Sequence, residues 1–412
     1  LVLDKIVEEM GDVVPNSFEF HYVKAWNLGY NEEGLLALGE AHQKDPENPA
    51  VFGSLMVFHE LLMNKDLKEQ FAQKLFASHF LSEGLLNYSY NVIMSVEQDG
   101  ILFTQGDNTT IPLWVLQEAL NIRKDVRVFN VDLLVQDSYR NQMFLEESLN
   151  YEENDPLLTS NNITESVSAL LNTIPRQNPD RKFYYALTLS NENISAVRDK
   201  LYVVGLASQI SDQSIDNIAI IKKNLEKHFL LDYLKVNFNG ESENATARVL
   251  SQNYLIPIIL LNQHYKNSGE EEKAEEWTNL ALQLSADRGK LNEVSFYLYN
   301  IEPEKTEFPP YELDIKALEK SMKNIKGKLY ASEFEVTNEG YNEFLQYLKD
   351  NHLDEMLKIS DIDLSGYHEP ALSLMKAYHY NHPGKAKNAT QFNKFPVVNI
   401  SYEAAQKYCE WL

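Results

Sequence analysis

The residues best suited to chemistry follow two apolar segments of the sequence. Asp107 and Asn108 stand in a polar turn directly after the apolar run 101–104, and Asp132 follows a second run at 126–130. Where a strand turns into a helix, the helix N-terminus offers free N–H groups and a partial positive charge. An anion or a sugar hydroxyl could bind at this helix start, with Asp132 on the opposite side of the site. Gly-Asp-Asn is also ordinary turn and capping chemistry, so a purely structural role stays open.

Histidines are the other candidate ligands. His379 and His382 are three residues apart, and on a helix this spacing presents two imidazoles to a metal ion. No carboxylate or cysteine stands at a convincing third position, and His42, His59 and His79 lack the spacing of a metal pair. The sequence therefore favours surface or core histidines, and we expect no metal.

Motifs for cofactors and nucleophiles are missing from the sequence. The chain has no P-loop, no G-x-G-x-x-G loop and no G-x-S-x-G elbow. Its single cysteine, Cys409, excludes an internal disulfide, a thiolate zinc site and an iron–sulfur cluster. We therefore expect no cofactor and no catalytic centre.

The elements that would position Asp107 and Asp132 form a small α/β unit, predicted over residues 85–210. Strands are predicted at 101–104, 126–130 and 183–189, with a helix beginning at Pro112. Strand, helix and strand in this order favour parallel pairing in a Rossmann-like arrangement. The polar stretch 145–180 is expected to be an excursion between strands.

Helical hairpins are predicted before this unit, in residues 1–84. Trp26, Leu36 and Leu38 place apolar groups at helical spacing, and Asp45-Pro46 closes one helical pair. The pattern resembles degenerate tetratricopeptide (TPR) repeats.

A second helical region is predicted over residues 211–300. Its clearest pair spans 254–266 and 270–285, where Gly269 makes the turn and small residues let the two helices approach closely. The predicted fold class is therefore α+β, mainly helical, with TPR-like hairpins on both sides of a small α/β unit.

The last part of the chain begins after a proline-containing stretch at 301–328, which has the composition of a linker. Residues 329–412 then form a new unit. It is expected to hold a strand from Leu329, a helix capped by Asn338, and a final helix capped by Ser401.

The stretch 91–134, which contains ILFTQGDNTTIPLWVLQEALNIRKDVRVFNVDLL, resembles a known family. Its turn and the helix after it are similar to the soluble C-terminal portion of a Bacteroidota membrane-protein family related to protein O-mannosyltransferases. The similarity continues through FYYALTL and LYVVGLASQI into the helical pair at 254–285. In that family catalysis belongs to the multispanning part, so the resemblance implies a fold rather than glycosyl transfer.

A second resemblance lies in residues 329–412. The segments EVTNEGYNEFLQYL and FPVVNISYEAAQKYCEWL are similar to the N-terminal third of the formylglycine-generating-enzyme or sulfatase-modifying fold, an α+β fold of C-type-lectin-like architecture. The resemblance implies that Cys409 has a structural position, because active members bind copper through a distal cysteine pair. The same architecture recurs in gliding-motility and type 9 secretion lipoproteins.

Length and charge restrict the partners. The chain has 412 residues, enough for two or three domains, and 37 basic against 61 acidic residues give a net charge of −24. Such a surface repels phosphate backbones and anionic membranes, so we expect no nucleic-acid partner. No apolar run is long enough to span a bilayer. Because residue 1 is Leu, we expect that a lipid anchor or membrane part lies outside the given sequence.

The favoured hypothesis is a non-catalytic scaffold or interaction protein outside the cytoplasm, in the periplasm or at the outer-membrane surface of a Bacteroidota-type cell envelope. Its partners would be proteins of an envelope complex, such as secretion or gliding machinery. One alternative is a glycan-binding or glycosyl-transfer accessory protein acting at Asp107 and Asn108. Another is a truncated enzyme of the sulfatase-modifying type.

Overall fold

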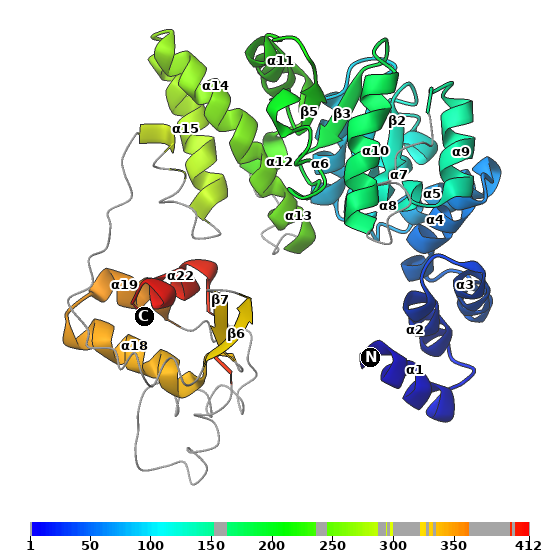
Figure 1. Ribbon diagram of the computed structural model, residues 1–412, viewed down its shortest axis with the longest axis horizontal. Coiled ribbons are helices and arrows are strands. Elements are labelled where there is room, and N and C mark those ends of the chain that lie inside the picture. The colour runs from blue at the N-terminus through cyan, green and yellow to red at the C-terminus, as the bar shows by residue number, and fades with distance from the viewer. Residues whose placement is uncertain are drawn as a thin grey trace. The chain divides into compact units, whose positions relative to one another are not determined.

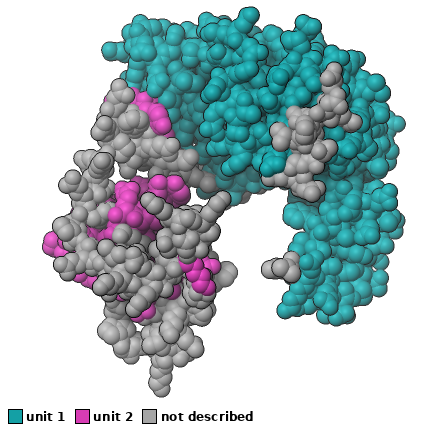
Figure 2. All heavy atoms as spheres, in the orientation of Figure 1, with its two compact units in different colours: residues 1–284 teal, residues 285–412 magenta. Residues whose placement is uncertain are grey.

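The chain divides into two compact units, residues 1–284 and 285–412, in the computed structural model (Figure 2). The structure describes residues 2–151, 163–235, 245–286, 294, 297–299, 322–326, 329–332, 335–361, 396–397 and 400–411. These residues are mainly helical, with a mixed five-stranded sheet in the first unit and a two-stranded sheet in the second. The α+β, mainly helical class predicted from the sequence is confirmed, and the finer domain boundaries stay a prediction.

The first unit begins with helices that pack in consecutive pairs, α2 on α3 and α4 on α5. Their bounds are α1 Val2–Val13, α2 Phe18–Leu28, α3 Glu32–Lys44, η1 Pro49–Val51, α4 Phe52–Leu61, α5 Lys65–Ala77 and α6 Glu83–Met94. The turn between α2 and α3 is tight, because a Cβ at Gly34 would lie 2.0 Å from the carbonyl oxygen of Gly29. Side chains of Ser17, Asn31 and Asn64 cap α2, α3 and α5 by accepting backbone N–H bonds.

Two apolar positions of these hairpins differ from the expected packing. Leu38 is buried, but Trp26 and Leu36 are 65% and 71% exposed. Helical spacing identifies an apolar stripe, whereas burial depends on whether another element covers that stripe. The sides of α2 and α3 that carry Trp26 and Leu36 are therefore only partly covered.

The sheet lies between two groups of helices of the first unit, α1 to α5 and α11 to α15 (Figure 1). Its strand order is β2-β1-β3-β5-β4. The elements of this region are β1 Ile101–Thr104, α7 Asp107–Leu120, β2 Arg127–Asn130, α8 Val131–Leu134, α9 Asp137–Glu146, α10 Ile163–Gln177, β3 Phe183–Ala186, η3 Arg198–Lys200, β4 Leu201–Val203 and β5 Ala207–Ile210. Strand β1 pairs in parallel with β2 and β3, as the sequence predicts, and an antiparallel hairpin of β4 and β5 extends the sheet.

Helix α7 begins five residues earlier than the sequence predicts. Asp107 is its first residue, so Pro112 lies inside the helix rather than in its first turn. Gly106 has a φ of 76°, which turns the chain sharply after β1, and its carbonyl oxygen accepts the hydroxyl of Thr110 at 2.8 Å. This bond helps to hold the first turn, so the helix starts before the proline.

The second helical group contains the pair predicted at 254–266 and 270–285. Its elements are α11 Asn217–Lys223, the π-helix η4 Asn224–His228, α12 Asp232–Lys235, α13 Ala245–Ser251, η5 Gln252–Tyr254, α14 Leu255–Asn267 and α15 Glu271–Ala286. Gly269 adopts a φ of 75° between α14 and α15. The buried Asn262 of α14 donates to the carbonyl oxygen of Ala274 and to the hydroxyl of Thr278, which holds the two helices together.

The second unit contains β6 Met322–Lys326, β7 Leu329–Ser332, α18 Asn338–Asp350, α19 Asp354–Ser360 and α22 Tyr402–Trp411. Strand β6 lies in the stretch that has the composition of a linker, and residues 301–321 of that stretch lie outside the described residues. Ser401 caps α22, as predicted. Thr337, not Asn338, caps α18, because Thr337 has extended backbone and its hydroxyl accepts the N–H of Gly340.

Candidate functional site

Asp107 is tied to the N-terminal hairpins. Its Oδ2 accepts the hydroxyl of Tyr30 at 2.7 Å, and Tyr30 lies in the turn between α2 and α3. Burial, and then the negative charge of Asp107, raise the pKa of the Tyr30 phenol well above its ordinary value. Tyr30 therefore stays protonated and keeps donating to the carboxylate at any physiological pH.

Around this bond lies a small pocket, which we call the Trp26 pocket. It has a volume of about 190 Å³ and is lined by Ala25, Trp26, Gly29, Tyr30, Leu38, Ser54, Phe58 and Asp107. The rings of Tyr30 and Phe58 meet edge to face at a centroid distance of 5.2 Å. Trp26 is 65% exposed, so much of its indole is accessible to solvent. The pocket thus combines aromatic and apolar walls with one carboxylate.

Asp132 has a different role from Asp107, although both follow strands at the same edge of the sheet. Its Oδ2 accepts the backbone N–H of Gly106 at 3.0 Å, and its Oδ1 accepts the side-chain amide of Gln105 at 3.4 Å. Burial raises the pKa of Asp132, and these two bonds oppose that effect. Asp132 thereby holds the loop after β1.

Gln105 extends this hydrogen-bonded network to the loop after β3. Its Oε1 accepts from the backbone N–H of Ser190 and from the side chain of Asn193, both at 3.1 Å. Three loops at the carboxyl edge of the parallel strands are thus fixed together. Asn108 is exposed in the first turn of α7, and neither it nor Asp132 is among the described residues that line the Trp26 pocket.

Trp26, Tyr30 and Phe58 of this pocket are not candidates in the sequence analysis. Tyr30 is 77 positions from Asp107, so no local motif links them. The only signal in the sequence is the residue type of Trp26, because tryptophan is enriched among residues that dominate binding; its exposure is evident only in the structure.

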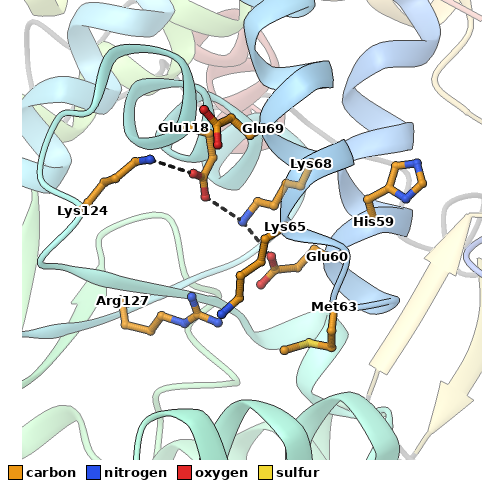
Figure 3. A pocket seen from close by; sticks show the side chains of 9 residues that line it. All are labelled: His59, Glu60, Met63, Lys65, Lys68, Glu69, Glu118, Lys124 and Arg127. Atoms are coloured by element: carbon orange, nitrogen blue, oxygen red, sulfur yellow. Dashed lines mark hydrogen bonds and ion pairs between the residues drawn. The ribbon is translucent and has the colours of Figure 1, made fainter.

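A second pocket, the charged pocket, has a volume of about 210 Å³ (Figure 3). It is lined by His59, Glu60, Met63, Lys65, Lys68, Glu69, Glu118, Lys124 and Arg127. Lys68 Nζ lies 2.7 Å from Glu60 Oε2 and 4.2 Å from the ring centroid of Trp114. Burial alone would raise the pKa of Glu60, but Lys68 and Arg127 outweigh this effect and hold it below its ordinary value.

The other cations of the charged pocket also face carboxylates. Lys124 pairs with Glu118 at 3.3 Å, and both Lys65 and Arg127 approach Glu146 Oε2, at 3.2 and 3.5 Å. Because its charges compensate one another, this pocket links α4, α5, α7, α9 and β2 without a need for a ligand.

His42 and His59, two of the histidines that the structure describes, pack against an aromatic ring. His42 and His59 both contact the ring of Phe71, and burial lowers the pKa of each imidazole. Among the described residues, no group of three or more His, Cys, Asp or Glu side chains is arranged to hold a metal ion. His79 is exposed, and His379 and His382 lie outside the described residues.

Comparison with protein families gives a match to TMEM260-associated domain 2. Residues 85–154 match this family. The match contains most of α6 and all of β1, α7, β2, α8 and α9, and therefore includes Asp107, Asn108 and Asp132. It agrees with the resemblance of this segment to a membrane-protein family related to protein O-mannosyltransferases.

Further comparisons give no relatives. No curated protein and no solved structure matches the chain. None of the described helices is long and apolar enough to cross a bilayer.

Proposed function

We propose that the chain is a non-catalytic interaction module that acts outside the cytoplasm, in a Bacteroidota-type cell envelope, within a protein complex such as secretion or gliding machinery. The observation that carries this proposal is the Trp26 pocket. It joins a helical hairpin to the α/β unit and presents an accessible indole beside the Asp107 carboxylate. Exposed tryptophans contribute strongly to protein interfaces because they bury a large area and lose little conformational entropy.

The helical hairpins support a scaffold role. The packing of α2 on α3 and of α4 on α5, and the bonds from Asn262 of α14 to α15, support the TPR-like repeats that the sequence predicts. Repeats of that class commonly display binding surfaces for other proteins. Gly34 fixes the tight turn of α2–α3, and Gly269 and Asn262 fix the turn and the contact of α14–α15. A partner would therefore meet a preformed surface, with little ordering cost on binding.

We propose further that the second unit is a segment of the formylglycine-generating-enzyme-like fold. Tyr341 and Phe344 of α18 pack against Tyr408 and Trp411 of α22 in one core. These are residues of the two motif segments, 335–348 and 395–412, which are separated by 46 residues in the sequence. The packing of both segments in one core supports this proposal, and Cys409 of α22 is exposed.

Capture of partners from envelope extracts tests the interaction function. The full chain and its Trp26→Ala variant serve as bait, with Phe80→Ala as a control because Phe80 is 56% exposed and outside the pocket lining. We expect partner capture by the full chain and by Phe80→Ala, and its loss with Trp26→Ala. A monomeric chain that captures no partner contradicts the proposal.

A second candidate function is glycan binding at the same pocket. An accessible aromatic ring packs against the C–H face of a sugar, while a carboxylate accepts its hydroxyl groups, and Trp26 and Asp107 supply both. A glycan array and thermal-shift screen tests it. A saccharide-specific shift that Asp107→Ala abolishes supports this function, and the absence of any shift supports the scaffold.

A further inference from the structure

We propose that the Trp26 pocket binds the cationic side chain of an arginine or lysine on a partner protein. This inference rests on the interaction function proposed above and names the chemistry of the partner. It draws on three properties of the pocket: its carboxylate, its aromatic walls and the charge of the surrounding hairpins.

The carboxylate of Asp107 is held in place and is only partly engaged. Tyr30 donates to Oδ2, and among the described residues no hydrogen bond to Oδ1 is found. The Tyr30 bond fixes the orientation of the carboxylate in advance, so an incoming N–H donor meets an oriented acceptor. Bonds between a cationic donor and a carboxylate are roughly twice as strong as neutral ones.

The aromatic walls suit a cation as well as an alkyl stem. Tryptophan is the residue type whose ring face attracts cations most strongly, and the pocket contains Trp26. Tyr30 and Phe58 add two further aromatic rings. Ala25 and Leu38 line the rest of the pocket and offer contacts to methylene groups. The volume of about 190 Å³ is that of one side chain rather than of an extended ligand.

The charge of the hairpins favours a basic partner. Residues 1–50 contain ten acidic and three basic side chains, a net charge of −7, within a chain whose net charge is −24. A field of this sign attracts cationic segments and speeds their association. The charged pocket differs in this respect, because its lysines and arginine already face Glu60, Glu118 and Glu146.

Fluorine NMR of the full chain, labelled with 5-fluorotryptophan, tests this proposal directly. The chain has four tryptophans, and Trp26 is exposed whereas Trp114, Trp277 and Trp411 are 1%, 4% and 6% exposed. The Trp26 signal is assigned from a Trp26→Phe variant. The probes are acetylated, amidated Gly-Arg-Gly and Gly-Lys-Gly, with the citrulline tripeptide as an uncharged control of similar shape.

We expect the arginine and lysine tripeptides to shift the Trp26 signal alone, and the citrulline tripeptide to leave it unchanged. Asp107→Asn should weaken binding about tenfold, which corresponds to ~1.4 kcal/mol. Glu83→Gln is the matched control, because Glu83 is another exposed acid at the start of a helix and lies outside the pocket lining. It should bind as the original chain does.

The outcomes separate this inference from the proposed function. The proposal of a cationic partner is wrong if the citrulline tripeptide shifts the Trp26 signal equally, or if Asp107→Asn binds the basic tripeptides as the original chain does. If the basic peptides fail while Trp26→Ala still abolishes partner capture, the interaction function stands and the cationic partner is wrong. If saccharides shift the Trp26 signal and basic peptides do not, the pocket belongs to the glycan-binding candidate. If the basic peptides shift the Trp26 signal but Trp26→Ala captures the partner as well as the original chain does, the cation site stands and the proposed role in partner capture is wrong.

Discussion

Replacing Lys68 with methionine should remove the cation that compensates a buried carboxylate. The side chains of Lys68 and Glu60 are 6% and 8% exposed, and their charged atoms lie 2.7 Å apart. At this distance and an effective dielectric constant of ~20, the Coulomb attraction is about 6 kcal/mol, before the cost of removing both charges from water. Loss of one partner of a buried pair typically costs ~3–5 kcal/mol.

We expect the lower end of that range, about 3 kcal/mol, for Lys68→Met. Tyr139 still donates to Glu60 Oε1 at 2.7 Å, and the charge of Arg127 still favours the ionised carboxylate. Urea unfolding followed by tryptophan fluorescence measures the change, since Trp114 lies directly under the Lys68 ammonium. The control is Lys65→Met, whose side chain is 69% exposed and should contribute less than ~1 kcal/mol.

The double variant Glu60→Gln/Lys68→Met should be more stable than Lys68→Met, because it leaves no unpaired carboxylate at this site. A loss for Lys68→Met no larger than that for Lys65→Met would refute the reasoning. It would mean that water or a neighbouring cation compensates Glu60 as well as Lys68 does.

Two further predictions concern pH and backbone geometry. The pKa of Glu60 is lower in the folded state, so the stability from its ionisation is fully present above its ordinary pKa of 4.5 and is lost as pH falls through the lowered value. Glu60→Gln should therefore destabilise the chain at pH 6, as measured by chemical denaturation. The loss of stability should become smaller toward pH 3. Gly34→Ala should destabilise the chain by ~2 kcal/mol or more, because the new Cβ would meet the Gly29 carbonyl. Gly39→Ala on the same helix has open space and should be neutral or slightly stabilising in thermal unfolding. Equal effects of the two substitutions would contradict the tight turn.

The central strands could be predicted from sequence because short apolar runs bounded by polar turns are a local signal. β1, β2 and β3 are such runs and lie close to their predicted positions. The hairpin of β4 and β5 was missed, since Leu201–Val203 is only partly buried and pairs with the sheet through β5 alone. Its strand conformation depends on a neighbour more than on its own pattern.

Caps and helix starts depend on backbone conformation, which the sequence expresses weakly. Thr337 and Asn338 are both good capping residues, and the choice between them follows from the extended backbone of Thr337. Asp107 rather than Pro112 begins α7 because Gly106 turns the chain earlier. The prediction for Ser401 is confirmed, since this residue stands directly before the first residue of α22.

The candidate site was predictable only in part. The strand-turn-helix pattern identifies Asp107 and Asp132, but not that one meets a distant hairpin while the other holds a loop. Periodicity assigned Trp26 to a packed face, and its exposure depends on which helices cover α2. The pair of Glu60 and Lys68 was missed because charged residues on helices usually face solvent.

Site-specific photo-crosslinking at position 26 tests the central claim most directly. Trp26 is replaced by p-benzoylphenylalanine in the full chain, which, unlike alanine in Trp26→Ala, keeps an aromatic side chain at this position to stack on a cation. A second chain carries the same group at position 80, where Phe80 is also exposed. The account predicts an adduct at position 26 with one partner protein, mapped beside an arginine or lysine. The absence of an adduct at position 26, or the same adducts in equal yield at position 80, would contradict it.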